Sequence, residues 1–147
     1  MMQDVVSGST TELSGLITRV VANNAGPMTA AGTNTYVVGC RDLAIIDPGP
    51  ADPLHIDAIM AAVGERCVRY VLVTHTHPDH SPAAAILAEK TGAQLIGCVL
   101  EDDGHQDRSF MVDANVHDGD LIAGSDFTLE AIATPGHVGN HFCYLLR

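Results

Sequence analysis

The sequence predicts an α/β fold in a single domain. Segments rich in β-branched residues alternate with segments whose apolar residues recur at helical spacing, which is typical of α/β proteins. The run Val68–Val73 is almost uniformly apolar, as expected of a strand buried on both faces of a sheet. A chain of 147 residues with 46% apolar residues can form one domain with a hydrophobic core, and is too short for two.

The first half of the chain predicts strands followed by a helix. Residues 1–15 are rich in Ser, Thr and Gly and are expected to be a polar lead-in to a domain that spans residues 16–147. Strands are expected at residues 16–22, 34–38 and 43–46. A helix is expected over residues 52–63, where Leu54, Ile56, Ile59, Met60 and Val63 follow helical spacing before Gly64.

The second half alternates again between the two kinds of segment. Ser81 and Pro82 predict the N-cap and first position of a helix that runs to about Lys90 and ends at Gly92. The acidic stretch from Glu101 to Asp113 predicts a loop. Further strands are expected at residues 68–73, 93–98, 121–123, 127–133 and 142–146.

Charge and hydropathy exclude several classes of protein. Seven basic and eighteen acidic residues give a net charge of −11, which argues against electrostatic binding of the nucleic-acid backbone over a broad surface. No uncharged apolar run approaches the length of a membrane span, so we expect no membrane contact. The first fifteen residues lack a basic stretch followed by an apolar core, which predicts a cytoplasmic location.

The cysteines do not form a recognisable metal or redox motif. No two of them make a Cys-x-x-Cys pair, and each lies in or beside an apolar run. This pattern predicts buried free thiols rather than disulfides or metal ligands. The four residues are Cys40, Cys67, Cys98 and Cys143.

The most informative segment follows the buried strand that ends near Val73. His75 and His77 are two residues apart, so their rings point to the same side of an extended backbone. The next residue is a proline that stops the strand, and the turn directs Asp79 and His80 toward the same cavity. Burying several unliganded histidines beside one another would cost stability, so the pattern predicts a metal site.

A further ligand is expected from a second loop. His137 follows a predicted strand and the pair Pro135-Gly136, which lets the backbone approach closely. Three neutral imidazoles, from His75, His77 and His137, satisfy one Zn²⁺ and leave a fourth position open for water.

A second metal ion is expected a few ångströms from the first, held by Asp79 and His80. A water held between two such cations loses a proton near neutral pH and becomes a nucleophile. We predict that Asp79 also acts as the catalytic residue that orients this water or accepts its proton. Histidine and carboxylate ligands serve Mn²⁺ and Fe²⁺ as well, so the pattern does not fix the metal as zinc.

Other polar residues have weaker signals. His55, His105 and His117 lie in polar or helical contexts and are interpreted as solvated. His141 lies four residues after His137 in a predicted turn, and we favour the same interpretation for it while a ligand role stays open. Asp47 ends an apolar strand before Pro-Gly, and is either a partner of a ligand histidine or a turn residue.

These motifs resemble those of a known family. The run from Thr74 to His80, followed by Thr134-Pro135-Gly136-His137, resembles the metal motifs of the metallo-β-lactamase superfamily, and Asp47-Pro48-Gly49 resembles its first motif. Residues 26–29 and 32–36 resemble more narrowly the β-lactamase-like protein 2 branch. The resemblance implies an αββα sandwich with a dimetal site at the rim between two sheets.

The resemblance also implies roles for the site residues and a range of activities. His75, His77 and His137 would hold the first zinc, and Asp79 with His80 the second. Members of the superfamily hydrolyse thioesters, phosphodiesters, lactams and lactones. The named branch includes single-stranded RNA endonucleases, which makes hydrolysis of a phosphodiester such as RNA the first prediction. Hydrolysis of a small-molecule thioester, as in enzymes of glyoxalase II type, is the alternative.

The sequence departs from the family pattern at its end. That pattern continues to an aspartate that bridges both metals and then to another histidine, whereas this chain ends at Arg147 and no Asp or Glu follows Glu130. We therefore expect mainly the N-terminal half of the sandwich, a mixed sheet with flanking helices, from a truncated or longer hydrolase. A complementing C-terminal segment or partner chain would supply the missing ligands. The alternative is an inactive metal-binding fragment or a module that forms a homodimer through an uncovered apolar sheet face.

Overall fold

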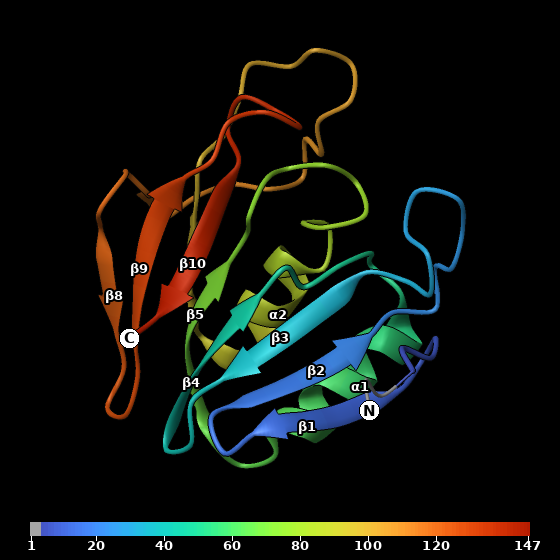
Figure 1. Cartoon of the computed structure of the whole chain (residues 1–147), viewed down its shortest axis with the longest axis vertical. Helices are drawn as coiled ribbons and strands as arrows, with labels where there is room; N and C mark the ends of the chain where they lie inside the picture. Colours follow the sequence, from blue (N-terminus) through green and yellow to red (C-terminus); the bar gives the residue numbers. More distant parts are fainter. Residues whose placement is uncertain (1–3) are drawn as a thin grey trace.

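The computed structural model describes residues 4–147, which form two helices and ten strands (Figure 1). The helices are α1 (Pro53–Val63) and α2 (Ala84–Thr91). The strands are β1 (Thr10–Ser14), β2 (Ile17–Val21), β3 (Asn34–Val38), β4 (Asp42–Ile46), β5 (Cys67–Leu72), β6 (Gln94–Gly97), β7 (Ala114–Asn115), β8 (Leu121–Ala123), β9 (Thr128–Ala133) and β10 (Phe142–Leu146). Most strands lie within two residues of their predicted positions.

Seven of the strands form one mixed sheet in the order of the sequence, β1 to β7. The pairs from β1 to β4 are antiparallel, and the pairs from β4 to β7 are parallel. Parallel neighbours need a crossover connection, and α1 and α2 supply the crossovers from β4 to β5 and from β5 to β6. Because right-handed crossovers that advance in one direction put their helices on one face, both helices cover the same face of the sheet.

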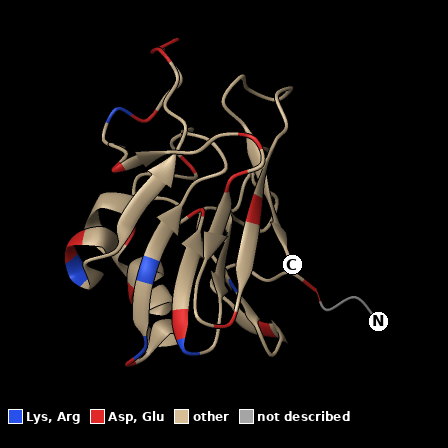
Figure 2. Cartoon of the chain, turned by 90° about the vertical axis from the view of Figure 1, so that its left-hand side faces the viewer, with Lys and Arg blue, Asp and Glu red and all other residues tan. Residues whose placement is uncertain are grey.

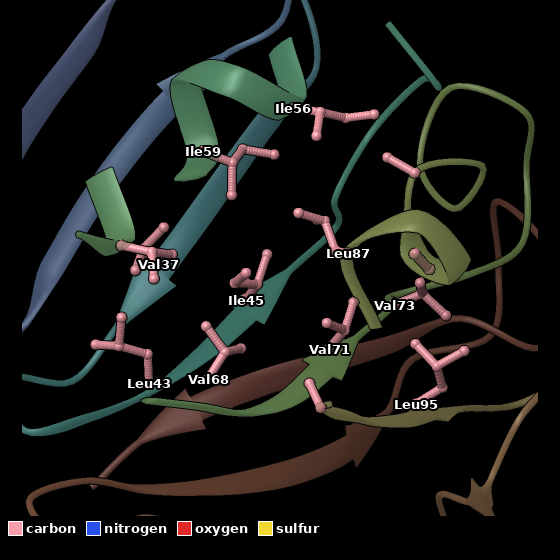
Figure 3. Close-up of a cluster of buried hydrophobic side chains, with 14 of the residues drawn as sticks. Val37, Leu43, Ile45, Ile56, Ile59, Val68, Val71, Val73, Leu87 and Leu95 are labelled. Atoms are coloured by element: carbon pink, nitrogen blue, oxygen red, sulfur yellow. The ribbon is translucent and has the colours of Figure 1, made fainter. Parts of the chain in front are cut away.

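A first apolar core fills the space between the helices and the large sheet (Figure 3). Ile56 and Ile59 of α1 and Leu87 of α2 meet strand side chains such as Ile45 and Val71 there. The central strands β4 and β5 are apolar on both faces because the opposite face of the sheet is also covered. This double burial explains the almost uniformly apolar run that the sequence shows in β5.

The other face of the large sheet packs against a second sheet with the order β10-β9-β8, in which all pairs are antiparallel. Leu72 and Ile96 of the large sheet contribute to this second core, together with Leu129, Ala131 and Phe142 of the small sheet. The described residues thus form a helix layer and two sheet layers. This arrangement confirms the predicted fold class, with its mixed sheet and flanking helices.

The outer face of the small sheet carries exposed apolar side chains. Leu121 is 64% exposed, Leu145 46% and Ile132 37%. Leu121 and Leu145 both lie opposite Glu130 in the ladder, so they share one row across the sheet. Glu130 between them pairs with Arg147, so apolar and charged side chains share this face, and the homodimer through an uncovered apolar face stays a prediction.

Two local predictions are wrong. No strand was expected within the polar lead-in, but its residues 10–14 form β1, which pairs with β2; residues 1–3 lie outside the described part of the chain. The second helix was expected to start at Ser81, but α2 starts at Ala84 and has no side-chain cap. The Ser81 hydroxyl instead donates to Asp107 Oδ2 at 2.6 Å, because the acidic loop folds back over this turn.

The environments of some cysteines and histidines also differ from expectation. All four cysteines are free thiols, but three of them are exposed and Cys98 is half-buried. Their apolar neighbours in sequence alternate across strands, so the cysteine itself can face solvent. His55 is buried rather than solvated, with Nε2 2.9 Å from Thr35 Oγ1, whereas His105 and His117 are exposed as predicted. Neither helix of the described chain is long and apolar enough to cross a membrane.

The contribution of the first core can be tested at α2. Leu87 is fully buried, so Leu87→Ala removes apolar burial and leaves a cavity. We expect the free energy of unfolding to fall by about 2–5 kcal/mol in urea denaturation of the metal-free protein. Leu54 on α1 is 70% exposed, and the control Leu54→Ala should change that free energy by less than about 0.5 kcal/mol. Equal effects of the two substitutions would contradict this packing.

The buried His55 predicts a stability that depends on pH. Burial lowers the pKa of His55 below its ordinary value of 6.5, despite the opposing charge of Asp52. Below about pH 6.5 His55 therefore binds a proton more readily in the unfolded chain than in the folded one, and its contribution to stability falls as the pH is lowered. His75 acts in the same direction, and His80, whose pKa is raised, acts in the opposite one. Because His55→Gln removes only the contribution of His55, the metal-free variant should lose less stability than wild type between about pH 7 and pH 5. Identical losses in a chemical denaturation series would contradict the prediction.

Candidate metal centre

The predicted metal ligands lie where the parallel strands end. Asp47 directly follows β4, and the run from Thr74 to His80 follows β5. Loops outside the carboxyl ends of parallel strands are the usual location of sites in α/β proteins. His137 lies on the loop between β9 and β10, and Phe142 N at the start of β10 donates to Thr74 O at 2.8 Å. The two sheets therefore bring two separate loops to one place.

Three histidines converge at this place. The ring centroids of His75 and His77 are 4.6 Å apart, and that of His137 lies 5.1 Å and 4.9 Å from them, respectively. His137 Nε2 is 3.2 Å from His77 Nδ1. Each of the three offers a ring nitrogen, and these nitrogens all lie within 4.8 Å of one another, close enough to bind one common ion. The pattern read from the sequence thus corresponds to a compact group of candidate metal ligands.

The carboxylate of Asp47 orients two of the imidazoles. Its Oδ2 accepts the Thr74 hydroxyl at 2.7 Å, and since that hydroxyl proton is used, Thr74 Oγ1 accepts from His75 Nδ1 at 2.9 Å. Asp47 Oδ2 also accepts from His80 Nδ1 at 3.0 Å. Both rings therefore carry a proton on Nδ1, and Nε2 is the lone-pair atom of the neutral His75 ring. Hydrogen bonds of this kind fix the tautomer of metal-binding histidines.

The Nε2 atom of His75 has the properties of a metal ligand. It is buried and has no hydrogen-bond partner in the described structure. Burial, together with the neighbouring His80 and His77, lowers the pKa of His75 to about 3, so the ring stays neutral at physiological pH. A buried lone pair without a partner costs stability. Three neutral imidazoles fit a zinc-type ion in both number and chemistry, so the donor set suits the predicted metal.

Asp79 and His80 lie beside the three histidines as a separate pair. Asp79 Oδ2 is 3.3 Å from His80 Nε2, and the His80 ring centroid lies 4.2 Å from that of His75. Burial alone would lower the pKa of His80, but the hydrogen bond and charge of Asp47, with the charge of Asp79, raise it instead. The pair offers two candidate ligands, and the group of three or more within reach of one ion contains only His75, His77 and His137 among the described residues. The binding of a second ion by Asp79 and His80 therefore stays a prediction.

Backbone contacts hold this pair in place. Thr33 Oγ1 donates to Asp79 O at 2.8 Å, and Gly49 N donates to His80 O at 2.8 Å. Asp47 itself has a φ of +50°, unusual for a residue with a side chain, and thereby turns the chain after β4. The loops after β2, β4 and β5 are therefore tied to one another around the site.

The structure adds residues that sequence reasoning left open or missed. Asp47 contacts a predicted ligand histidine and is more than a turn residue. His141 belongs to the group, because its ring centroid lies 5.1 Å from that of His75 and its Nδ1 is 2.8 Å from Thr134 Oγ1. Burial lowers the pKa of His141, which keeps it neutral. The sequence indicated that His141 lies near the site only by its place four residues after His137. The shape of the loop, which brings the two rings to the same group, could not be predicted from the sequence.

A pocket of about 500 Å³ opens beside the histidines. Its wall is formed by Met28, Thr29, the run from His77 to His80, Gly104, His105 and His137. No lysine or arginine is among these described lining residues. The loop that contributes Gly104 and His105 carries the acidic residues Glu101, Asp102, Asp103 and Asp107 and one basic residue, Arg108, which pairs with Asp102. Figure 2 shows basic positions scattered singly along the ribbon rather than gathered into a patch.

Comparison with known proteins supports this description. The model of the metallo-beta-lactamase superfamily matches residues 28–147. The lactamase-like protein aptB of Emericella nidulans is 34% identical over 140 residues, which cover 93% of this chain and 43% of that protein. An atrochrysone carboxyl ACP thioesterase of Aspergillus chevalieri is 34% identical over 137 residues, covering 89% of this chain and 42% of that protein. The chain thus spans about two fifths of the length of these curated relatives.

Solved structures show the same fold. BJP-1, a subclass B3 metallo-beta-lactamase of Bradyrhizobium japonicum, superposes with a TM-score of 0.76 at 23% identity, over 96% of this chain and 57% of that one. ETHE1 of Myxococcus xanthus superposes with a TM-score of 0.62 at 30% identity, over 78% of this chain and 48% of that one. The narrower resemblance to the β-lactamase-like protein 2 branch stays a prediction. The family model, the relatives and the fold agree, and this chain belongs to the metallo-β-lactamase superfamily.

Proposed function

We propose that the chain carries the metal centre of a hydrolase that cleaves thioesters. The observation that supports a metal-dependent hydrolase most directly is the convergence of His75, His77 and His137 beside a pocket of about 500 Å³. Imidazoles from two loops are a ligand set for catalytic zinc. The thioester class is favoured by the names of several relatives.

In this proposal the three histidines hold one Zn²⁺, and Asp79 with His80 contribute to a second site. Bound zinc would polarise a carbonyl group and lower the pKa of a coordinated water. Asp47 orients both rings by accepting the hydroxyl proton of Thr74, which in turn accepts from His75 Nδ1, and the Nδ1 proton of His80. Asp79, which is 35% exposed and lies in the pocket wall, orients the attacking water or accepts its proton.

The relatives favour a thioester over a phosphodiester. Several of them have names of thioesterases that act on atrochrysone carboxyl ACP. The charge of a bound zinc ion would attract an anionic and a neutral ester alike to the site, so local charge does not separate the two classes. Hydrolysis of RNA, the first prediction from the sequence, is ranked second because of the names of these relatives.

The metal centre itself can be tested at His77. His77→Ala removes one of the three converging ligands, and we expect the affinity for Zn²⁺ to fall by more than about 100-fold, since even partners of ligands contribute about 10–100-fold. Affinity is measured by competition with a chromophoric chelator, and bound metal by elemental analysis after dialysis. His117 is 76% exposed at its side chain and serves as the control, with His117→Ala keeping wild-type affinity. Equal affinities of the two variants would contradict the site.

The substrate class is tested by comparing three compounds on the zinc-loaded chain. We expect metal-dependent hydrolysis of a neutral acyl thioester, and rates at least about tenfold lower for a β-lactam and for an aryl phosphodiester. Chelation should abolish the activity, and His77→Ala should remove it while His117→Ala keeps it.

The opposite outcomes are equally informative. Faster turnover of the phosphodiester than of the thioester would overturn the proposed substrate class and restore RNA-type hydrolysis. A chain that binds zinc tightly and hydrolyses none of the three compounds would favour the inactive metal-binding module, whose catalysis depends on a complementing segment or partner.

A further inference from the structure

We propose that Asn140 is a positioning residue that fixes the loop of His137 against the two histidines that follow β5. The inference rests on the proposed metal centre and concerns how that centre is assembled. Asn140 lies three residues after His137 and is 2% exposed, whereas His137 itself is exposed. Because few contacts hold an exposed ring, the buried amide of Asn140 is in a better position than His137 itself to fix where His137 lies.

Both amide protons of Asn140 are used to join separate segments. Nδ2 donates to Thr76 Oγ1 at 2.9 Å and to Cys98 O at 2.7 Å. Thr76 is the residue between His75 and His77, so the first bond reaches the centre of the histidine run. Cys98 follows β6 at the start of the acidic loop. One side chain thus links the three segments that carry His137, the other histidines and the pocket wall.

The surrounding groups determine which way the amide points. Thr76 Oγ1 donates to Gln106 Oε1 at 2.6 Å, so its proton is used and it accepts from Asn140. The backbone carbonyl of Cys98 only accepts. A flipped Asn140 would place its own oxygen against both acceptors. The orientation of Gln106 is fixed in turn because its Nε2 donates to the Asp103 carboxylate at 3.2 Å.

The hydrogen-bond network continues into the acidic loop. Asp107 N donates to Thr76 O at 2.7 Å, and the Ser81 hydroxyl donates to Asp107 Oδ2 at 2.6 Å. Thr76 is therefore held through its side chain and its backbone. The loop that closes one side of the pocket is attached at the same residue that separates the two ligand histidines.

The loop of His137 is held more firmly at its base than at its tip. At the base, Thr134 N donates to His141 O at 2.9 Å. At the tip, the backbone bonds from Gly136 N to Val138 O and from His141 N to Val138 O are both long at 3.4 Å. Val138 is buried, but an apolar contact fixes direction less strictly than two hydrogen bonds. Metal coordination tolerates displacements of only a few tenths of an ångström, so rigid support of each ligand affects affinity. Asn140 provides this support.

The test compares metal affinity with stability in matched variants. Asn140→Asp keeps the shape of the side chain but places an acceptor against the acceptor Cys98 O. Thr76→Val removes the hydroxyl that joins Asn140 to Gln106, and Thr76→Ser restores it. The control Asn115→Asp introduces the same charge at an exposed asparagine. Each variant is titrated with Zn²⁺, its Co²⁺ absorption spectrum is recorded, and the melting temperature of its metal-free form is measured.

We expect Asn140→Asp and Thr76→Val to weaken Zn²⁺ binding by about 10–100-fold and to change the Co²⁺ spectrum. Thr76→Ser and Asn115→Asp should bind as the wild type does. A purely structural role would lower the melting temperature of the metal-free protein without altering affinity or spectrum. If Asn140→Asp does not fold, the difference in Zn²⁺ affinity between Thr76→Val and Thr76→Ser tests the positioning role.

Two results would overturn the inference, and they are distinguishable. Wild-type affinity in both Asn140→Asp and Thr76→Val, with tight binding by the wild type, would reject the positioning role and leave the proposed function intact. Absence of Zn²⁺ binding by the wild type would reject the metal centre and the positioning role together.

Discussion

The hydrogen bonds of Asp47 are the interaction on which the rest of the site depends. One buried carboxylate at the end of β4 accepts from the backbone and hydroxyl of Thr74, at 2.7 Å each, and from His80 at 3.0 Å. These bonds attach the end of β5 to the end of β4 and select the tautomers of His75 and His80. Without this acceptor, the imidazoles would be free to rotate, and the buried nitrogens would lose their common direction.

The architecture explains why ligands so distant in sequence can meet. Because both crossover helices lie on one face of the large sheet, its other face is free to pack against the small sheet. That packing puts the loop between β9 and β10 beside the loop after β5, and it brings His137 to His75 across more than sixty residues of chain. The motif after β5 supplies His75 and His77, and the packing of the two sheets brings His137 to them.

Periodicity and turn residues predicted most of the strands, α1 and the α/β class, because burial on one or both faces leaves a regular pattern. The sandwich of two sheets followed from the resemblance to the family. The convergence of His137 with His75 and His77 followed from strand-end placement. Contacts between distant segments were not predictable: Ser81 donates to Asp107 instead of capping α2, and His55 is buried against Thr35. Asn140 has no motif signal at all, since its importance lies in partners 42 and 64 residues away.

The outer face of the small sheet has a consequence for the behaviour of the protein in solution. Leu121, Ile132 and Leu145 are exposed on this face around the ion pair of Glu130 and Arg147, and the net charge of the chain is −11. Copies of the chain repel one another through this net charge. At physiological ionic strength the Debye length is only about 8 Å, so the repulsion is screened while the attraction between apolar side chains remains. Association through this face, which stays a prediction, would therefore strengthen rather than weaken as salt is added.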